Sequence, residues 1–531
     1  MSRMRLLWIC LVGLLPACAD LNSKDYGYCK DDNDVEASQF CREDLGIRFA
    51  RFSIEIKSPA GGGAAVNGGV VGIEAELSAH TNKPDDPTGL DFKVAPGKCN
   101  GGSAATDSLT SSGPTSPVTD SNGTHRATYK ADFNATQEGD FCVHVSYPES
   151  MEKTVDIHVD KTAPVVTFTS TPPDPSVMGS ANFAFAFSED TNTSQCSIDG
   201  APFANCPSQQ AGSYVGLSDG AHTLTVKVLD RVGNIGQTQF TWHIRCANPN
   251  IYVDAANGSN ANAGNTPNAA YQTITYALSK ATTGQTIKVL PGTYNSSIGE
   301  SFPLNVPEGV CVVGDVANKG NGATPTFVSG CGTTRVPENP RSATFKLGKD
   351  AVVAGIRTDD LSCNAFYSDS SGAIIHSNSA LGNPLSLSDN IAATIGANAS
   401  GYCISSNVVS SIYIGIVLAT DNPGKLEYNS VNCNAAGADL IGVTHADFGL
   451  GPFGSAGLNN LSCNAGFGGI TIENASGTVY AGNNYWENQT PTTVVGSTGM
   501  SAGIWMDSAN TAAKTRVITT SALKAPACQC P

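Results

Sequence analysis

Two groups of charged residues in the second half of the chain have a spacing suited to acid–base chemistry. Arg357 is followed by Asp359 and Asp360, and His445 is followed by Asp447. Residues i and i+2 of a β-strand lie on the same face, so Arg357 would face the same way as Asp359, and His445 the same way as Asp447. Carboxylates and histidine are side chains that enzymes use to move protons. A surface charge pair is the commoner meaning of each spacing.

Asp254 begins the segment that offers the best sequence case for a metal. It is followed by Asn257, Asn260 and Asn262, which supply oxygen without charge, and by alanines, which supply none. A hard cation such as calcium prefers charged carboxylates, so its affinity here should be low. We therefore interpret the three asparagines as turn formers and expect no metal or other cofactor, with calcium as the alternative.

The chain has 17 cysteines, which is typical of a protein folded in an oxidising compartment. With Cys10 in the leader and Cys18 set aside, 15 remain, so at least one thiol stays free or pairs between chains. Cys528 and Cys530 lack the spacing of a zinc site, and we expect no structural metal. The disulfide candidates are Cys29 with Cys41, Cys99 with Cys142, Cys196 with Cys206, and Cys433 with Cys463, the last two being alternatively buried thiols.

Residues 1–17 have the pattern of an export signal. Arg3 and Arg5 precede an apolar run from Leu6 to Leu15, which is too short to span a bilayer. The sequence Leu-Pro-Ala-Cys ending at Cys18 resembles a bacterial lipobox, and the resemblance implies that Cys18 is acylated. An ordinary secretory signal cleaved after Ala17 or Ala19 is the alternative. We expect a lipid-anchored protein of the bacterial outer membrane or cell surface.

Charge excludes one class of partner. The net charge is −16, and it becomes −18 without Arg3 and Arg5. Such a surface repels the phosphate backbone, so nucleic acid is not expected to bind.

The chain should be all-β, with two immunoglobulin-like β-sandwiches followed by a right-handed parallel β-helix. Residues 18–45 are polar and acidic and predict a tether. Residues 46–161 alternate short apolar strands with turns and predict the first sandwich. Within it, residues 101–123 are rich in Gly, Ser and Thr and predict a mobile loop.

Residues 162–246 predict the second sandwich. Asp199-Gly200 marks a tight hairpin turn between Cys196 and Cys206, and Asp230-Arg231-Val232-Gly233-Asn234 marks another turn. These motifs resemble the bacterial immunoglobulin-like repeats of surface proteins. The resemblance implies a spacer or adhesive module.

Residues 247–525 change character, and residues 526–531 are a short tail. The run Ile287-Lys288-Val289-Leu290-Pro291-Gly292-Thr293-Tyr294 resembles the opening of pectate-lyase-like β-helices, often catalogued as a domain of unknown function. Residues 273–281 would form a short helix that caps the open end, with Ile274, Ala277 and Leu278 facing inward.

An internal repeat supports a solenoid independently. The pattern Cys-Asn-Ala recurs at Cys363, Cys433 and Cys463, and the last two are one 30-residue period apart. A strand–turn–strand unit of this length cannot bury its own face, so successive turns must stack. The repeated asparagines would then form ladders that satisfy turn amides.

Three functions fit this architecture. Among β-helix enzymes of this kind, pectate lyases use acidic clusters that hold calcium and an arginine base. Galacturonan hydrolases use several aspartates on adjacent turns, with His and Arg-x-Lys nearby. Neither motif is reproduced here. We therefore favour a non-catalytic surface protein that presents the β-helix for adhesion or polysaccharide binding. A polysaccharide lyase or glycoside hydrolase is one alternative, and a structural envelope component is another. The partners would be the membrane, through the lipid, and a polysaccharide or surface protein. Aromatic side chains that could stack on sugars, or else pack in the core, are Tyr413, Tyr428, Phe448, Phe453, Phe467 and Trp486.

Overall fold

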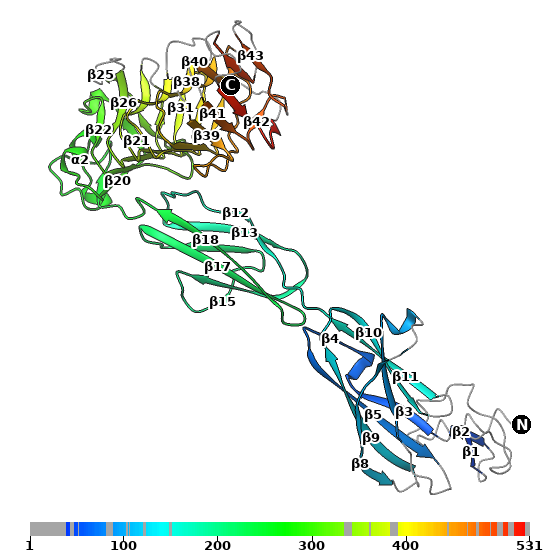
Figure 1. Ribbon diagram of the computed structural model, residues 1–531. Coiled ribbons are helices and arrows are strands. Elements are labelled where there is room, and N and C mark those ends of the chain that lie inside the picture. Colours follow the sequence, from blue (N-terminus) through cyan, green and yellow to red (C-terminus); the bar gives the residue numbers. More distant parts are fainter. Residues whose placement is uncertain are drawn as a thin grey trace, which may run out of the picture. The chain divides into compact units, whose positions relative to one another are not determined.

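The computed structural model is all-β and contains three parts along the chain (Figure 1). It describes residues 39–42, 47–50, 52–80, 89–101, 105, 107–119, 124–147, 151–333, 342–359, 363–382, 391–442, 445–464, 466–473, 477–488, 490–495, 503–507 and 515–525. No helix among these residues is long and apolar enough to cross a membrane. The predictions for Cys18, for the Cys29–Cys41 pair, for Asp360 and for Cys528 and Cys530 lie outside the described residues.

The first sandwich consists of two sheets whose strands are antiparallel, except that β4 pairs parallel to β11. A short hairpin of β1 (Gln39–Arg42) and β2 (Ile47–Ala50) precedes it. One sheet has the order β3 (Phe52–Ser58), β5 (Gly69–His80), β9 (Thr124–Ala135) and β8 (Ser111–Thr119). The other has the order β4 (Gly63–Val66), β11 (Met151–Val159), β10 (Gly139–Tyr147), β6 (Asp91–Pro96) and β7 (Asp107–Ser108). Alternate residues of both sheets, such as Ile73, Leu77 and Val143, meet in the core.

Strand β8 corrects the expectation of a mobile loop at residues 101–123. Residues 111–119 pair with β9 at the edge of the sheet, with two register irregularities. Residues 111–114, 118 and 119 are exposed, in agreement with the polar composition. It does not exclude a strand, because pairing with β9 satisfies the backbone without requiring an apolar face.

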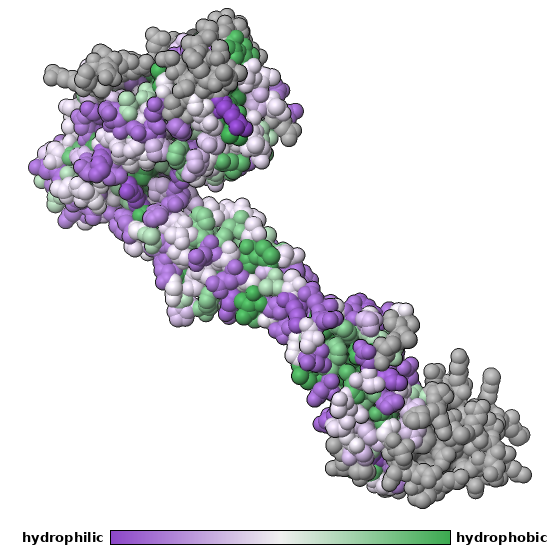
Figure 2. Space-filling view, viewed as in Figure 1, coloured by the Kyte–Doolittle hydropathy of each residue, from purple (hydrophilic) through white to green (hydrophobic). Residues whose placement is uncertain are grey.

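The second sandwich has a three-stranded and a four-stranded sheet. The first is β12 (Val166–Ser170), β13 (Ser180–Phe187) and β16 (Ala211–Val215). The second is β15 (Ala204–Asn205), β14 (Thr191–Ile198), β17 (Gly220–Asp230) and β18 (Ile235–Ile244). Trp242 is fully buried and packs edge-on against Phe183. Figure 2 shows apolar residues scattered among polar ones over the visible surface of the sandwiches.

Residues after Asn250 wind through three parallel sheets, as expected for a β-helix. The first parallel sheet comprises β19 (Ile251–Val253), β20 (Thr286–Val289), β23 (Cys311–Val313), β27 (Val352–Ala354), β30 (Ile374–His376), β33 (Tyr402–Ser405), β36 (Gly424–Glu427), β39 (His445–Gly449), β41 (Gly477–Ala481) and β45 (Thr515–Ile518). The second comprises β21 (Gly292–Tyr294), β24 (Thr326–Val328), β28 (Arg357–Thr358), β31 (Ser379–Leu381), β34 (Val408–Ser410) and β37 (Ser430–Asn432).

The third parallel sheet completes each turn of the solenoid. It comprises β22 (Leu304–Val306), β26 (Ser342–Leu347), β29 (Asn364–Ser368), β32 (Ile391–Ile395), β35 (Ile414–Leu418), β38 (Ala436–Ile441), β40 (Gly468–Glu473), β44 (Ile504–Met506) and β43 (Thr493–Val495), with β25 (Gly332–Thr333) paired to β26. A pair of short strands, β42 (Tyr485–Trp486) and β46 (Leu523–Lys524), lies nearest the C-terminus. One continuous apolar core runs inside the sheets.

A short helix caps the first turn, as the sequence predicts. Helix α2 (Ile274–Lys280) buries Ile274, Ala277 and Leu278, and the Thr273 side chain accepts a hydrogen bond from the backbone of Tyr276. Glu300 accepts hydrogen bonds from the backbone N–H groups of Ile274 and Thr275 at 2.6 and 2.8 Å. The helix therefore closes the open end of the apolar core.

Asparagine ladders hold the turns of the β-helix in register. The backbone N–H of Asn378 donates to Oδ1 of Asn407 at 2.9 Å, and the pattern repeats from Asn407 to Asn429, from Asn429 to Asn459 and from Asn459 to Asn484. A second ladder joins Ile412, Asn434 and Asn464 in the same way. The Cys-Asn-Ala repeat at Cys433 and Cys463 predicts the second ladder. The first ladder, from Asn378 to Asn484, has no equally clear sequence motif.

The disulfides include two of the predicted pairs. Cys99 is bonded to Cys142, and Cys196 is bonded to Cys206 across the hairpin of the second sandwich. Cys433 and Cys463 are both disulfide-bonded. Two bonds had no local signal in the sequence, namely Cys246–Cys311 and Cys331–Cys363. Among the described residues Cys403 is a free and buried thiol.

Candidate functional site

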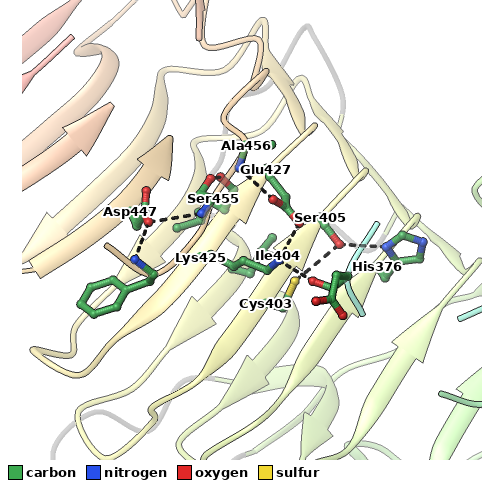
Figure 3. A network of polar contacts seen from close by, with 12 residues as sticks. His376, Cys403, Ile404, Ser405, Lys425, Glu427, Asp447, Ser455 and Ala456 are labelled. Carbon is green, nitrogen blue, oxygen red and sulfur yellow. Dashed lines mark hydrogen bonds and ion pairs between the residues drawn. The ribbon is translucent and has the colours of Figure 1, made fainter. Parts of the chain in front are cut away.

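A network of polar side chains lies on the outer face of the first parallel sheet (Figure 3). Cys403 and Lys425 occupy one register position on neighbouring strands, and Ser405 and Glu427 occupy the position two residues later. His376 pairs in register with Ser405. Because i and i+2 face the same way, these five side chains share one face of strands β30, β33 and β36.

A chain of polar contacts joins His376, Ser405 and Cys403. Its residue types are those of a nucleophile, Ser405 or Cys403, beside a base, His376. His376 Nδ1 is 2.8 Å from Ser405 Oγ, and Cys403 Sγ is 3.7 Å from the same oxygen. Burial, with a smaller contribution from Lys319, lowers the pKa of His376 to about 4. Burial raises the pKa of the Cys403 thiol to about 11. At neutral pH the imidazole is thus uncharged and weakly basic, and the thiol is protonated, so neither is activated for catalysis.

Lys425 and Glu427 form a buried ion pair beside these groups. Lys425 Nζ lies 3.0 Å from Glu427 Oε1 and also donates to the backbone oxygen of Asp174. Burial opposes the charge of Lys425, but Cys403, Glu427 and Asp174 together raise its pKa above the ordinary value. Glu427 accepts a further bond from the backbone of Ala456 at 3.0 Å. The carboxylate is therefore engaged by the protein itself and is not available as a general base.

Asp447, a predicted candidate, organises a loop. It is fully buried, and its carboxylate accepts hydrogen bonds from four backbone N–H groups at 3.0 to 3.3 Å, those of Gly449, Gly451, Phe453 and Ser455. Its predicted companion His445 lies at the exposed start of strand β39. The geometry at Asp447 is that of a structural carboxylate that holds residues 449–455 over the strand.

Arg357 and Asp359, the other predicted pair, do lie together. Arg357 Nε and Nη2 donate to the two carboxylate oxygens of Asp359 at 3.0 and 2.7 Å, and Phe327 lies under the guanidinium at 5.8 Å. The hydrogen bonds that Arg357 donates to Asp359 raise the pKa of Arg357 above its ordinary value. The pair is about one-third exposed. A guanidinium held in this two-point contact remains protonated, which is unfavourable for a base.

The one group that could hold a metal ion among the described residues lies before the β-helix. Ligand atoms of Asp160, Glu189 and Asp230 lie within 4.8 Å of one another. Burial and the charges of Asp160, Asp230 and Glu138 raise the pKa of Glu189. Asp230 is nearly inaccessible, and hydrogen bonds with the turn at residues 232–234 outweigh burial and lower its pKa. Sequence reasoning missed this group because its members come from three separate segments.

Asp254 lies in a turn stabilised by local hydrogen bonds. Its carboxylate accepts bonds from the backbone of Ala256 and Asn257 and from the Asn257 side chain. Asn260 accepts from the backbone of Gln272 and Thr273, and Asn262 donates to the backbone of Ala270. These side chains form turns and are used in local hydrogen bonds.

The aromatic candidates divide between the core and the surface. Phe448 and Trp486 are each 1% exposed and belong to the core. Tyr428 is 37% exposed, and Tyr413, Phe453 and Phe467 are half-buried. The third parallel sheet adds a residue that sequence reasoning missed, Trp505. Its ring lies 6.1 Å from that of Phe467, which in turn lies 6.4 Å from that of Tyr413.

Comparisons with known proteins give no activity for this chain. Residues 256–494 match the family described as "Protein of unknown function (DUF1565)". No curated protein matches the chain. Similar solved structures include the fibronectin(III)-like modules of Clostridium thermocellum CbhA, with 14% identity, a TM-score of 0.20 and coverage of 36% of this chain and 93% of that chain. Murine CEACAM1b has 12% identity, a TM-score of 0.17 and coverage of 36% and 99%. The Yersinia pseudotuberculosis adhesin InvE also has 12% identity, with a TM-score of 0.14 and coverage of 36% and 58%.

Proposed function

We propose that this chain is an exported, lipid-anchored surface protein that presents its β-helix for adhesion or polysaccharide binding and does not catalyse a reaction. The observation that carries the proposal is the state of the polar groups on the first parallel sheet. His376, Cys403, Glu427 and Asp447 are buried and engaged by the protein's own groups. A catalytic group must instead reach a substrate atom.

The arrangement of acidic residues supports the same proposal. Among the described residues of the β-helix, no three histidine, cysteine or acidic side chains come close enough to hold a cation together. Cleavage by a calcium-dependent lyase of the predicted type would need such a cluster across neighbouring turns. The proposal therefore includes no cofactor.

The binding surface we favour is the aromatic cluster formed by Tyr413, Phe467 and Trp505. These half-buried rings come from three turns along the third parallel sheet, with the turn of Ala435 between those of Tyr413 and Phe467. Aromatic side chains provide large contact areas with little loss of conformational entropy on binding. Their partial exposure leaves ring surface free to contact a sugar or a side chain of another surface protein.

The test is binding and turnover of residues 18–531, with Cys18 replaced by Ser for solubility, on a polysaccharide array with and without calcium. We expect retention on at least one polymer with no soluble product under either condition. Release of unsaturated or reducing-end products would overturn the non-catalytic proposal. Failure to bind any glycan, together with failure to bind bacterial or host cell surfaces, would overturn adhesion and favour an envelope component.

A further inference from the structure

An apolar stripe covers part of the outer face of the first parallel sheet. Cys311, Val352, Ile374 and Cys403 follow one another at the same register position on strands β23, β27, β30 and β33. The neighbouring residues Val312, Val353, Ile375 and Ile404 point into the core of the solenoid, so the stripe points outward. An outward stripe of this kind should be exposed in a free solenoid, yet its four members are at most 7% exposed.

Two chain segments from the region before the β-helix cover this stripe. Val177 and Cys246 form one buried cluster with the stripe residues. The two segments also bind each other, because the Ser176 N–H donates to His243 O and the Arg245 N–H donates to Ser176 O, each at 2.8 Å. All of these residues belong to the same compact unit as the β-helix. We call residues 174–178 and 243–246 the clasp.

Polar and covalent bonds fix the clasp to three different turns of the solenoid. Lys425 Nζ on β36 donates to the backbone oxygen of Asp174, and Arg245 lies 3.9 Å from Asp350 next to β27. Cys246 is bonded to Cys311 on β23. The buried Lys425–Glu427 pair thus has a role in the structure, since it places an ammonium group where the clasp offers a carbonyl.

The disulfide also changes the route by which force would enter the β-helix. Without it, tension on residue 246 would act first on β19, a strand of three residues that pairs with β20. Such a short terminal strand can be separated one hydrogen bond at a time. With the disulfide intact, tension passes from Cys246 to β23 directly, and residues 247–310 lie outside the load path.

We propose that the clasp is a load-bearing joint, in which residues 174–178 and the Cys246–Cys311 bond carry tension between the second sandwich and the β-helix and shield the first turns of the solenoid. That the protein experiences tension depends on the proposed surface function. The joint, however, is a property of the isolated protein, and its test uses neither an anchor nor a ligand.

Cys403 provides a natural reporter, because its thiol is buried in the cluster that contains Val177. The rate at which a maleimide labels it in native residues 18–531, measured by mass spectrometry of the Cys403 peptide, reports opening of the clasp. We expect the double variant C246S/C311S to be labelled at least about tenfold faster than wild type, since loss of a crosslink favours opening. The matched control is C196S/C206S, which removes a disulfide of the second sandwich and should leave the rate unchanged. Equal rates in C246S/C311S and wild type would overturn the clasp.

A second variant and a second measurement keep the proposal falsifiable if C246S/C311S does not fold. Lys425→Met removes the donor to Asp174 with little change in volume and should also accelerate labelling of Cys403. In single-molecule pulling from the two chain ends, residues 247–310 should not extend before the solenoid yields in the oxidised wild type. Under a reducing agent, an early step of about 230 Å should appear, from a separation of 65 residues. Such a step in the oxidised protein, or its absence after reduction, would contradict the load path.

Discussion

At the scale of single residues, the ladder from Asn378 to Asn484 links the backbones of neighbouring turns of the β-helix. Asn429 Nδ2 donates to Ile404 O and to Asn459 Oδ1 at 2.8 and 2.9 Å, and Asn429 Oδ1 accepts from the Asn407 backbone at 3.0 Å. The side chain is 1% exposed, so water cannot replace these partners. Removing one side of a buried hydrogen bond leaves the other side unsatisfied.

We therefore expect Asn429→Ala to lower the free energy of unfolding of the β-helix by about 3 kcal/mol. Urea unfolding followed by circular dichroism measures the change. The control is Asn305→Ala, because the Asn305 side chain is exposed and donates to the nearby Pro303 backbone. A loss equal to that of the control would show that the ladder does not hold the turns together.

The buried imidazole of His376 should make the free energy of unfolding depend on pH. Its pKa is lowered from 6.5 to about 4 in the folded chain, so the unfolded chain binds the proton more tightly. The stability contributed by the neutral imidazole is fully present above pH 6.5 and is lost as the pH falls through 6.5 toward 4. A shift of this size corresponds to about 3 kcal/mol.

The measurement is the difference in unfolding free energy between wild type and His376→Gln from pH 7.5 to pH 4. We expect wild type to lose stability faster than the variant, because glutamine keeps a polar contact to Ser405 but does not titrate. Parallel curves for the two proteins would mean that His376 takes up its proton without opening the fold.

At the scale of elements, the third parallel sheet positions the aromatic cluster. Tyr413 and Phe467 immediately precede strands β35 and β40, whose first residues both pair with Ala436. The residue before Ala436 is Ala435, which is small enough to let the two rings meet across it. Trp505 lies on the next strand, β44, opposite Thr471, which is four residues after Phe467.

We expect Phe467→Ala and Trp505→Ala each to weaken binding to the retained glycan or cell surface by about tenfold, as anchor aromatics do at interfaces. Binding isotherms at equal folded concentration give the change. Phe453→Ala is the matched control, since Phe453 is also half-buried but lies in the loop over β39. Equal losses in all three variants would indicate a general effect on the fold, and no loss in any would place the binding surface elsewhere.

The elements could be predicted from local sequence patterns. The contacts between residues far apart in the sequence could not. The 30-residue period and the Cys-Asn-Ala repeat indicate stacked turns, and the apolar spacing at Ile274, Ala277 and Leu278 identifies the capping helix. The Cys196–Cys206 bond follows from a tight turn only a few residues long. Each of these depends on residues that are close in sequence.

The candidate site was less predictable because burial decides its chemistry. Spacing correctly places Arg357 beside Asp359, but the cover on Asp447 comes from residues 449–455 and cannot be inferred from alternation. The Cys246–Cys311 bond joins residues 65 positions apart, with many other cysteines as possible partners. The clasp over the first parallel sheet was missed for the same reason.

At the scale of the whole molecule, the proposed anchor would place all of this architecture at a membrane through a single residue. Cys18 follows a short apolar run and is the acylation site that the lipobox resemblance implies. The rest of the chain offers little attraction to an anionic membrane, because its net charge is −16 even with the two arginines of the leader. Membrane association should therefore depend on the lipid and not on surface charge.

We expect the full-length chain expressed in a Gram-negative host to fractionate with membranes and to incorporate labelled palmitate, and Cys18→Ser to appear in the soluble periplasmic fraction without label. High salt should not release the full-length chain from the membrane, since electrostatic attraction does not hold it there. Ala17→Asp is a useful companion, because it leaves the cysteine in place but removes the small residue before it, and it should also block acylation. If Cys18→Ser stays with the membrane even in high salt, the folded domains hold the chain there. Tension on the clasp would then have to begin at a surface of the sandwiches and not at Cys18.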